Sequence, residues 1–492
     1  MLFNSLTFVV FFCVVFLVYW RLPHRAQNLF LLAASLFFYG SWNAAFLGLI
    51  IASATIDYLC AAAIARSADP RTRKRWLMLA IGASLTILGF FKYANFFVEN
   101  FVELSQALGF EASRPVLNII LPVGISFHTF QSMAYTIDVY RREIEPCKRY
   151  LDFVLFVAFF PQLVAGPIER ARRLLTQVMR PRPRLNVGAI VEGIKLIVVG
   201  YAQKVAIADT LAPQVDRAFA DPRALDSLAL LFALYAFAIQ IYCDFAGYSN
   251  IARGTARLLG FELMRNFREP YLATNITEFW RRWHISLSSW LRDYLFIPLG
   301  GTRRGPRRTM VNLMITMLLG GLWHGAAWTF VVWGGLHGLY LAVHRFVRGS
   351  LGPPGSSLAS SSAAAPGGRA RLEPGGPRRK SWGRQFLGGI VTFHLVCLAW
   401  VFFRAESATD AFAYLAGIGR GTAALERASA VILVYVAASF ALDGLLARRG
   451  ARHLVRLFSR HWALETVGVT ALLLVTLLVG ENHVVPFIYF QF

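Results

Sequence analysis

Residues 310–345, MVNLMITMLLGGLWHGAAWTFVVWGGLHGLYLAVHR, form a long apolar stretch that glycines and one histidine interrupt near its middle. Basic segments border the stretch on both sides, at Arg303–Arg308 and at residues 345–384. In membrane proteins an excess of Lys and Arg marks the cytoplasmic loops. The stretch must therefore leave the cytoplasm and return to it, which predicts two short membrane helices joined by a turn near His324.

The composition of the whole chain agrees with a membrane location. Hydrophobic residues make up 56% of the 492 residues and charged residues only 16%, whereas soluble domains have about 45–50% apolar and about 25% charged residues. Five scattered cysteines include no CxxC pair, so neither a disulfide scaffold nor a cysteine metal site is expected. Intrinsic disorder is excluded by the same apolar content.

The net charge of +23 raises the question of a nucleic-acid partner, which would require the basic residues to share one folded face. Instead they gather in short segments between apolar runs, at 66–75, 141–150, 169–184, 303–308, 345–384 and 448–460. The polar stretches on the opposite side are neutral or slightly acidic. This pattern indicates membrane topology and argues against nucleic acid.

Apolar runs long enough to cross a bilayer, or nearly so, predict an all-α, polytopic membrane protein. These runs are 3–20, 28–40, 44–65, 77–98, 116–140, 190–207, 228–250, 386–403, 430–446 and 463–480. With the basic loops in the cytoplasm, both termini are predicted to lie outside. Segments 151–168 and 271–300 each lie between two basic regions, so we expect both to re-enter the membrane around a central cavity.

A low-complexity segment divides the chain. Residues 349–385 are rich in Gly, Ser, Pro and Arg and are predicted to be a flexible cytoplasmic linker. The predicted organisation is a membrane core over 1–348, this linker, and C-terminal transmembrane helices over 386–492.

His324 is the strongest candidate for chemistry, in the sequence Gly320-Gly321-Leu322-Trp323-His324-Gly325. Glycines allow a ligand or another backbone to approach closely, and the ring of Trp323, itself a candidate substrate-binding residue, excludes water from one side of the imidazole. Histidine titrates near neutral pH and is the most frequent general base. His337, in the similar sequence Trp333-Gly334-Gly335-Leu336-His337-Gly338, is a second candidate, for substrate binding.

Residues 278–294 (EFWRRWHISLSSWLRDY) carry a second group of candidates. If this segment is one helix, Arg281, His284 and Ser288 share a face, with Trp280 beside them, and this face suits an anionic or thioester ligand. Asp244 lies within the apolar run 228–250. An ionisable residue inside a membrane segment is a candidate functional residue, so Asp244 is also predicted to bind substrate.

Other kinds of site lack their sequence signals. HExxH, CxxC, the Walker loop and the dinucleotide fingerprint are all missing from the sequence. His324 and His337 are too far apart for two metal ligands spaced one helical turn apart. We therefore expect no metal and no bound cofactor.

Five stretches give the chain a family resemblance. They are LPVGISFHTFQ (121–131), FPQLVAGPI (160–168), CDFAGYS (243–249), residues 279–291 and the Trp323-His324-Gly325 box. With these stretches the chain resembles the membrane-bound O-acyltransferases, and within them the alginate O-acetyltransferase branch.

The resemblance implies a helical bundle around a thinned central funnel, with His324 as the catalytic histidine and His284 in the same functional region. It further implies that an acetyl group moves from a cytoplasmic thioester, acetyl-CoA or another acyl thioester, across the bacterial inner membrane. A periplasmic or membrane-anchored acetyltransferase partner would then complete the O-acetylation of an exported polysaccharide, with alginate the expected polymer.

Three alternatives remain open from the sequence. A secondary transporter would also show many spans and intramembrane ionisable residues, although its paired broken segments are not found. An inactive scaffold could recruit a soluble acetyltransferase. Within the enzyme class, D-alanyl transfer to teichoic acid would use a carrier protein as the donor.

Overall fold

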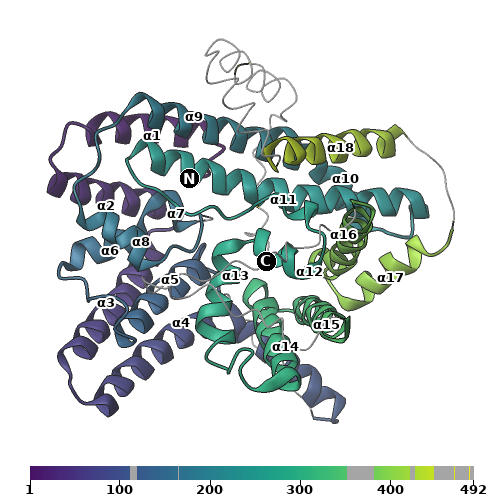
Figure 1. The fold of residues 1–492 in the computed structure, drawn as a ribbon, viewed down its shortest axis with the longest axis horizontal. Helices are drawn as coiled ribbons and strands as arrows, with labels where there is room; N and C mark the ends of the chain where they lie inside the picture. The colour runs from purple at the N-terminus through teal and green to yellow at the C-terminus, as the bar shows by residue number, and fades with distance from the viewer. Residues whose placement is uncertain are drawn as a thin grey trace, which may run out of the picture.

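The computed structural model describes residues 1–110, 119–164, 166–351, 382–421, 427–447, 470 and 487, and every regular element in these ranges is helical (Figure 1). Four helices in this part of the chain are long and apolar enough to cross a membrane, namely α3, α4, α11 and α16. The predicted all-α, multi-pass fold is confirmed.

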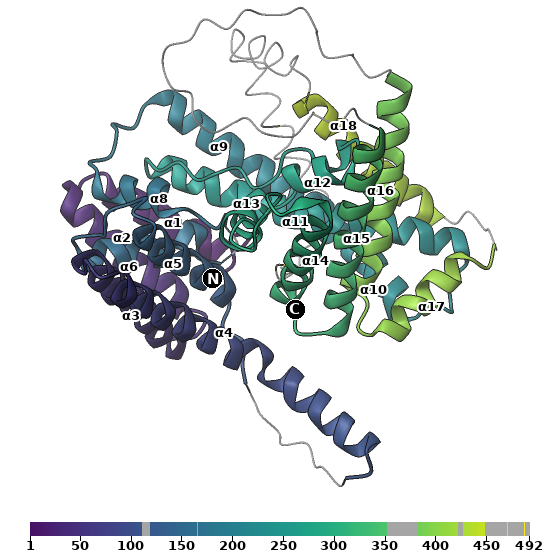
Figure 2. The same ribbon diagram turned by 60° about the horizontal axis from the view of Figure 1, so that its bottom comes forward.

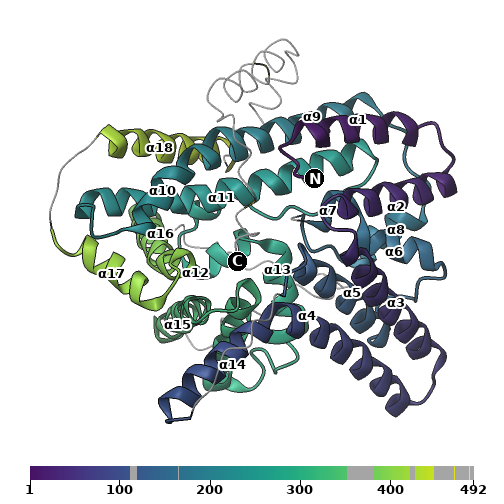
Figure 3. The same cartoon turned by 180° about the vertical axis from the view of Figure 1, so that it is seen from behind.

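Four helices form the N-terminal part: α1 (Leu6–Tyr19), α2 (His24–Gly40), α3 (Ala45–Arg66) and α4 (Pro70–Ala107). They match the first four predicted runs. Asp69 begins α4 by accepting hydrogen bonds from the backbone N–H groups of Arg71 and Thr72, as an N-cap residue does. Figures 1 and 3 show α4 running from the side of α3 past the centre of the molecule towards α14 and α15.

Helices α5 (Ile125–Tyr140), α6 (Tyr150–Ala158), α7 (Phe160–Leu163) and α8 (Ala171–Met179) follow. Both α6 and α7 are too short to cross a bilayer, which needs about 20 residues. The break between them comes at Phe159, directly before Phe160 and Pro161. The predicted interruption of segment 151–168 is therefore present, and re-entry into the membrane stays a prediction.

Helix α11 (Ser227–Leu258) is the most buried of the four long apolar helices and packs along α9 (Val187–Tyr201). Two glycine pairs allow this approach. A Cβ atom on Gly247 would lie 2.7 Å from the carbonyl oxygen of Gly200, and one on Gly254 would lie 2.5 Å from that of Gly193. Small residues permit close backbone packing between membrane helices. A π-helix, η1 (Ala202–Asp209), joins α9 to α10 (Thr210–Ala220).

Segment 271–300, for which we expect re-entry into the membrane, contains only short helices, and its re-entry stays a prediction. The elements are the 3₁₀ turn η2 (Pro270–Leu272), α12 (Ile276–Arg282), α13 (Ile285–Leu291) and the π-helix η3 (Arg292–Phe296). The predicted hairpin follows as α14 (Gly305–His324) and α15 (Trp328–Leu351), joined by a short turn.

The described C-terminal helices are α16 (Trp382–Arg404), α17 (Ala408–Ile418) and α18 (Arg427–Ala447). Helices α16 and α18 agree with the predicted runs 386–403 and 430–446, whereas α17 lies between them, where the sequence predicts no run. Figure 2 shows α14, α15 and α16 side by side. Most of the predicted linker, at residues 352–381, and the predicted span 463–480, apart from residue 470, lie outside the described residues.

Candidate functional site

His324 is the last residue of α14, as the predicted turn required, and its side chain is buried. Two helix contacts without room for a Cβ atom hold the hairpin together. A Cβ on Gly321 would lie 2.2 Å from the carbonyl oxygen of Phe330, and one on Gly334 would lie 2.3 Å from that of Met317. The glycines noted in the sequence therefore allow α14 and α15 to pack backbone to backbone.

Aromatic rings surround the imidazole of His324. The ring centroids of Trp323 and Trp333 lie 5.0 Å from it, and that of Phe403 lies 5.3 Å away. Such a surrounding excludes bulk water, which strengthens electrostatic interactions within it. A proton transfer at this imidazole would therefore take place in a dry site.

His284 lies beside His324, with 6.3 Å between the two ring centroids. It is completely buried, and its backbone is in the left-handed region, at φ 41° and ψ 55°. This conformation is uncommon for residues other than glycine. It ends α12 and allows α13 to begin in a new direction, so the imidazole points into the molecule.

The prediction that Arg281, His284 and Ser288 share a helix face is wrong, because the helix breaks at Trp283–His284. Asn266 holds this break, since its carbonyl oxygen accepts the Ile285 N–H at 2.8 Å and its Oδ1 accepts the Ser286 N–H at 3.1 Å. As a result, Arg281 is exposed while His284 is buried. The Ser288 hydroxyl donates to the carbonyl oxygen of Trp283 at 3.0 Å.

His337 extends the cluster along α15. Its ring centroid lies 4.8 Å from that of Trp333 and 5.1 Å from that of Trp280. Trp280, a predicted binding residue, therefore packs against His337. In the part of the chain that is described, neither ring nitrogen of His284 or His337 has a hydrogen-bond partner, and the indole nitrogens of Trp280 and Trp333 also have none. Leaving a buried polar group unpaired costs about 1–3 kcal/mol. Several such groups in one cluster indicate a site built to bind a polar ligand.

The carboxylate of Asp244 is engaged inside the helix bundle. Lys204 Nζ lies 2.6 Å from Asp244 Oδ1 and 2.6 Å from Asp209 Oδ1, and all three side chains are buried. Sequence reasoning missed Lys204 and Asp209. Phe245, the next residue after Asp244, packs against His284 with 4.7 Å between ring centroids. Asp244 therefore lies next to a residue of the site wall, and its substrate-binding role stays a prediction.

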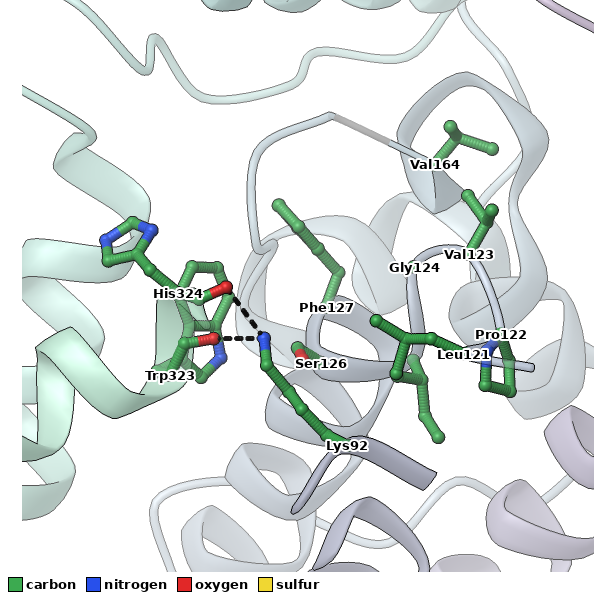
Figure 4. A pocket seen from close by; sticks show the side chains of 11 residues that line it. Lys92, Leu121, Pro122, Val123, Gly124, Ser126, Phe127, Val164, Trp323 and His324 are labelled. Carbon is green, nitrogen blue, oxygen red and sulfur yellow. Dashed lines mark hydrogen bonds between the residues drawn. The ribbon is translucent and has the colours of Figure 1, made fainter. Parts of the chain in front are cut away.

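A partly open pocket lies on the other side of the His324 backbone (Figure 4). Its lining comes from α4, from the start of α5 and from the end of α14, and includes Lys92, residues 121–127, Val164, Trp323 and His324. In Figure 4 the imidazole of His324 points away from this pocket, whereas its carbonyl oxygen faces Lys92. The predicted site residue Trp323 thus lies between the pocket and the histidine cluster.

Helix α16 supplies two site residues that sequence reasoning missed. Phe403 packs against His324, and the Trp400 ring stacks on that of Trp333 with 5.8 Å between centroids. Both belong to the apolar run 386–403, in which nothing distinguishes a site-facing aromatic residue from a lipid-facing one. The helix that follows the predicted linker therefore contributes to the same site as the preceding core.

Three buried histidines thus lie together within a bundle of apolar helices, and sequence comparison gives the class of the protein. Residues 117–354 match the family model of the membrane-bound O-acyltransferases. The chain belongs to this family, and it is a multi-pass membrane O-acyltransferase.

Among its relatives, the probable alginate O-acetylase of Azotobacter vinelandii is 43% identical over 411 residues, which cover 83% of this chain and 76% of that protein. The peptidoglycan O-acetyltransferase of Helicobacter pylori is 35% identical over 449 residues, or 85% of this chain and 80% of that protein. The teichoic acid D-alanyltransferase of Streptococcus thermophilus is 29% identical over 244 residues, or 47% of this chain and 58% of that protein.

Proposed function

We propose that this enzyme moves an acetyl group across the membrane for the O-acetylation of a polysaccharide outside the cytoplasm, with alginate as the first candidate polymer. Membership of the O-acyltransferase family and the high coverage of two polysaccharide O-acetylating relatives support this proposal. The acetyl donor is a cytoplasmic thioester, acetyl-CoA in the simplest case. Family membership also favours an enzyme over the transporter and the inactive scaffold.

The observation that carries the proposal is the contact between His324 and His284 within one aromatic enclosure. One imidazole nitrogen of His324 takes the proton of an acceptor hydroxyl while the hydroxyl oxygen attacks the thioester carbonyl carbon. The carbon–sulfur bond then breaks, and the thiolate leaves with the proton from His324. General-base assistance of this kind contributes about 10²–10⁴-fold.

His284 is assigned to the carbonyl oxygen, which gains negative charge as the bond forms. Its ring nitrogens face this site without a partner among the described residues, and a preorganised donor stabilises such an oxyanion. His337, Trp280 and Trp323 bind the donor beside it. The exposed Arg281 contacts the donor from outside the cluster, and Ser288 fixes the break beside His284. Asp244 is structural, because Lys204 holds its carboxylate.

The proposed location is the bacterial inner membrane, with both termini outside. A periplasmic or membrane-anchored acetyltransferase accepts the acetyl group and passes it to the polymer. The second candidate function is D-alanyl transfer to teichoic acid, which the partial similarity to the Streptococcus thermophilus enzyme favours.

The decisive experiment measures O-acetyl and D-alanyl esters on secreted and wall polymers of a deletion strain. The strain is complemented with the wild-type protein, with His324→Ala or with His394→Ala, an exposed histidine of α16 that serves as the matched control. We expect O-acetyl groups to disappear in the deletion strain and with His324→Ala, and to return with the other two proteins. Unchanged O-acetyl content with His324→Ala at normal membrane levels would contradict the proposal, and a selective loss of D-alanyl esters would establish the second function.

A further inference from the structure

The end of α14, which carries His324, has an unusual set of hydrogen bonds. A helix leaves its last four carbonyl groups without partners inside the helix, and many helices satisfy them by a left-handed glycine. Gly325 is instead extended, at φ −157°, and its N–H makes only a 3.4 Å bond to the carbonyl oxygen of Gly321. The carbonyl groups of residues 322–324 must therefore be satisfied from elsewhere.

Two adjacent residues of α4 satisfy all three carbonyl groups. The Lys92 ammonium donates to the carbonyl oxygen of Trp323 at 2.5 Å and to that of His324 at 3.0 Å, and the Tyr93 hydroxyl donates to that of Leu322 at 2.7 Å. A cation at a helix C-terminus also interacts favourably with the helix dipole. Such charge-assisted bonds are about twice as strong as neutral ones, and more so away from water.

The same helix also holds the far side of the turn. The indole nitrogen of Trp328, the first residue of α15, donates to Asn100 Oδ1 at 2.7 Å, and the Trp328 ring packs against that of Phe96 at 5.8 Å. Both ends of the turn that positions His324 are thus attached to α4. Placing a lysine within an apolar membrane helix costs free energy. The hydrogen bonds of Lys92 to the backbone carbonyl groups of residues 323 and 324 offset this cost.

We propose that Lys92 is a positioning residue for acyl transfer, because it fixes the backbone from which the His324 imidazole projects. Lys92 contacts the carbonyl side of this turn, and the imidazole points the other way (Figure 4). On that side the imidazole packs against the rings of Trp333 and Phe403. The inference rests on the proposed role of His324 as general base. Lys92 itself acts through the backbone of residues 323 and 324.

The test compares O-acetyl content per folded enzyme in the complemented deletion strain for four variants. Lys92→Met removes the charge and the donors at similar length, whereas Lys92→Arg keeps both. Lys74→Met makes the same change at an exposed site on the same helix, and His324→Ala defines the inactive level. The amount of folded enzyme is measured by size-exclusion chromatography of each variant fused to a fluorescent protein.

We expect Lys92→Met to lose at least ~10-fold per folded enzyme, since a misplacement of about 1 Å can cost 10²-fold in rate. Lys92→Arg should recover a substantial part of the lost acetylation, and Lys74→Met should match the wild type in acetylation per folded enzyme. Hydrogen exchange of the turn around Gly325 in the purified enzyme should be faster in Lys92→Met and slow again in Lys92→Arg.

A loss in Lys92→Met that only follows the loss of folded enzyme would overturn the inference, as would equal losses in Lys92→Met and Lys92→Arg. If His324→Ala is inactive and Lys92→Met is fully active, only the positioning role fails. If His324→Ala remains active, the proposed function itself fails, whatever the Lys92 variants do.

Discussion

The imidazole rings of His284 and His324 lie 6.3 Å apart, and each is held at a point where a helix is interrupted. One interruption is the break between α12 and α13, and the other is the end of α14. Interrupted helices can place side chains inside a membrane bundle where a straight helix would direct them along its own face. In this enzyme two interruptions meet at one buried site.

Substitution of His284 should reduce catalysis without unfolding the enzyme. His284→Asn keeps a residue that tolerates the left-handed backbone, but its amide reaches only about as far as the ring Nδ1, so the donor at Nε2 is lost. If Nε2 is the donor, we expect acetylation per folded enzyme to fall about 10²-fold, in the range seen when one oxyanion donor is lost. The loss should be smaller than that of His324→Ala. The measurements are the O-acetyl esters on the polymer and the thermal unfolding of the purified protein. Normal activity of His284→Asn would show that the His284 ring only contributes to packing.

The sequence predicted the hairpin of α14 and α15 because its signals are local. Basic residues lie at both ends, and the glycines and His324 lie at the turn. The break at His284 could not be predicted, since the spacing of Arg281, His284 and Ser288 also fits a continuous helix. What breaks the helix is Asn266, a residue from the preceding loop that bonds the backbone of Ile285 and Ser286.

Lys92 was missed for a related reason. In the sequence it is one lysine in the apolar run 77–98, and the groups that it bonds are backbone carbonyls of residues 323 and 324. Backbone partners leave no sequence signal at all. Phe403 and Trp400 were likewise hidden among the aromatic residues of a membrane helix, so the helical fold was predictable and the far wall of the site was not.

His337 offers a test that separates polarity from packing. Its ring is nearly parallel to that of Phe279, at 6.1 Å between centroids, and lies edge-on to Trp333. His337→Phe keeps an aromatic ring of similar size, so we expect a nearly unchanged melting temperature together with a clear loss of activity. His337→Ala should also lower stability, by about 3 kcal/mol for the cavity it leaves. Full activity of His337→Phe would assign His337 to packing alone.

The close packing of α14 on α15 predicts different results for two glycines of the hairpin. Gly321→Ala would place a methyl group 2.2 Å from the carbonyl oxygen of Phe330, whereas Gly335→Ala would meet only a side-chain carbon of Leu318 at 3.6 Å. Backbone cannot move as a side chain can, so we expect Gly321→Ala to cost about 1–3 kcal/mol, as overpacking does, and to displace His324.

The measurement for this pair is the melting temperature and the acetylation per folded enzyme of both variants. Gly335→Ala should match the wild type in both. Equal melting temperatures and equal acetylation for the two variants would show that α14 and α15 can lie farther apart than they do in the structure.

Two substitutions can distinguish a structural role of Asp244 from a substrate-binding role. They change the buried charged group formed by Lys204, Asp209 and Asp244. Lys204→Met leaves two carboxylates buried without their cation, and breaking a buried pair in this way costs about 3–5 kcal/mol. Asp244→Asn leaves Lys204 paired with Asp209 at 2.6 Å, so its cost should be smaller. We therefore expect the amount of folded enzyme to fall strongly in Lys204→Met and mildly in Asp244→Asn, with unchanged acetylation per folded molecule in Asp244→Asn. A fully folded but inactive Asp244→Asn enzyme would instead show that this carboxylate contacts the substrate, as its position in the sequence first indicated.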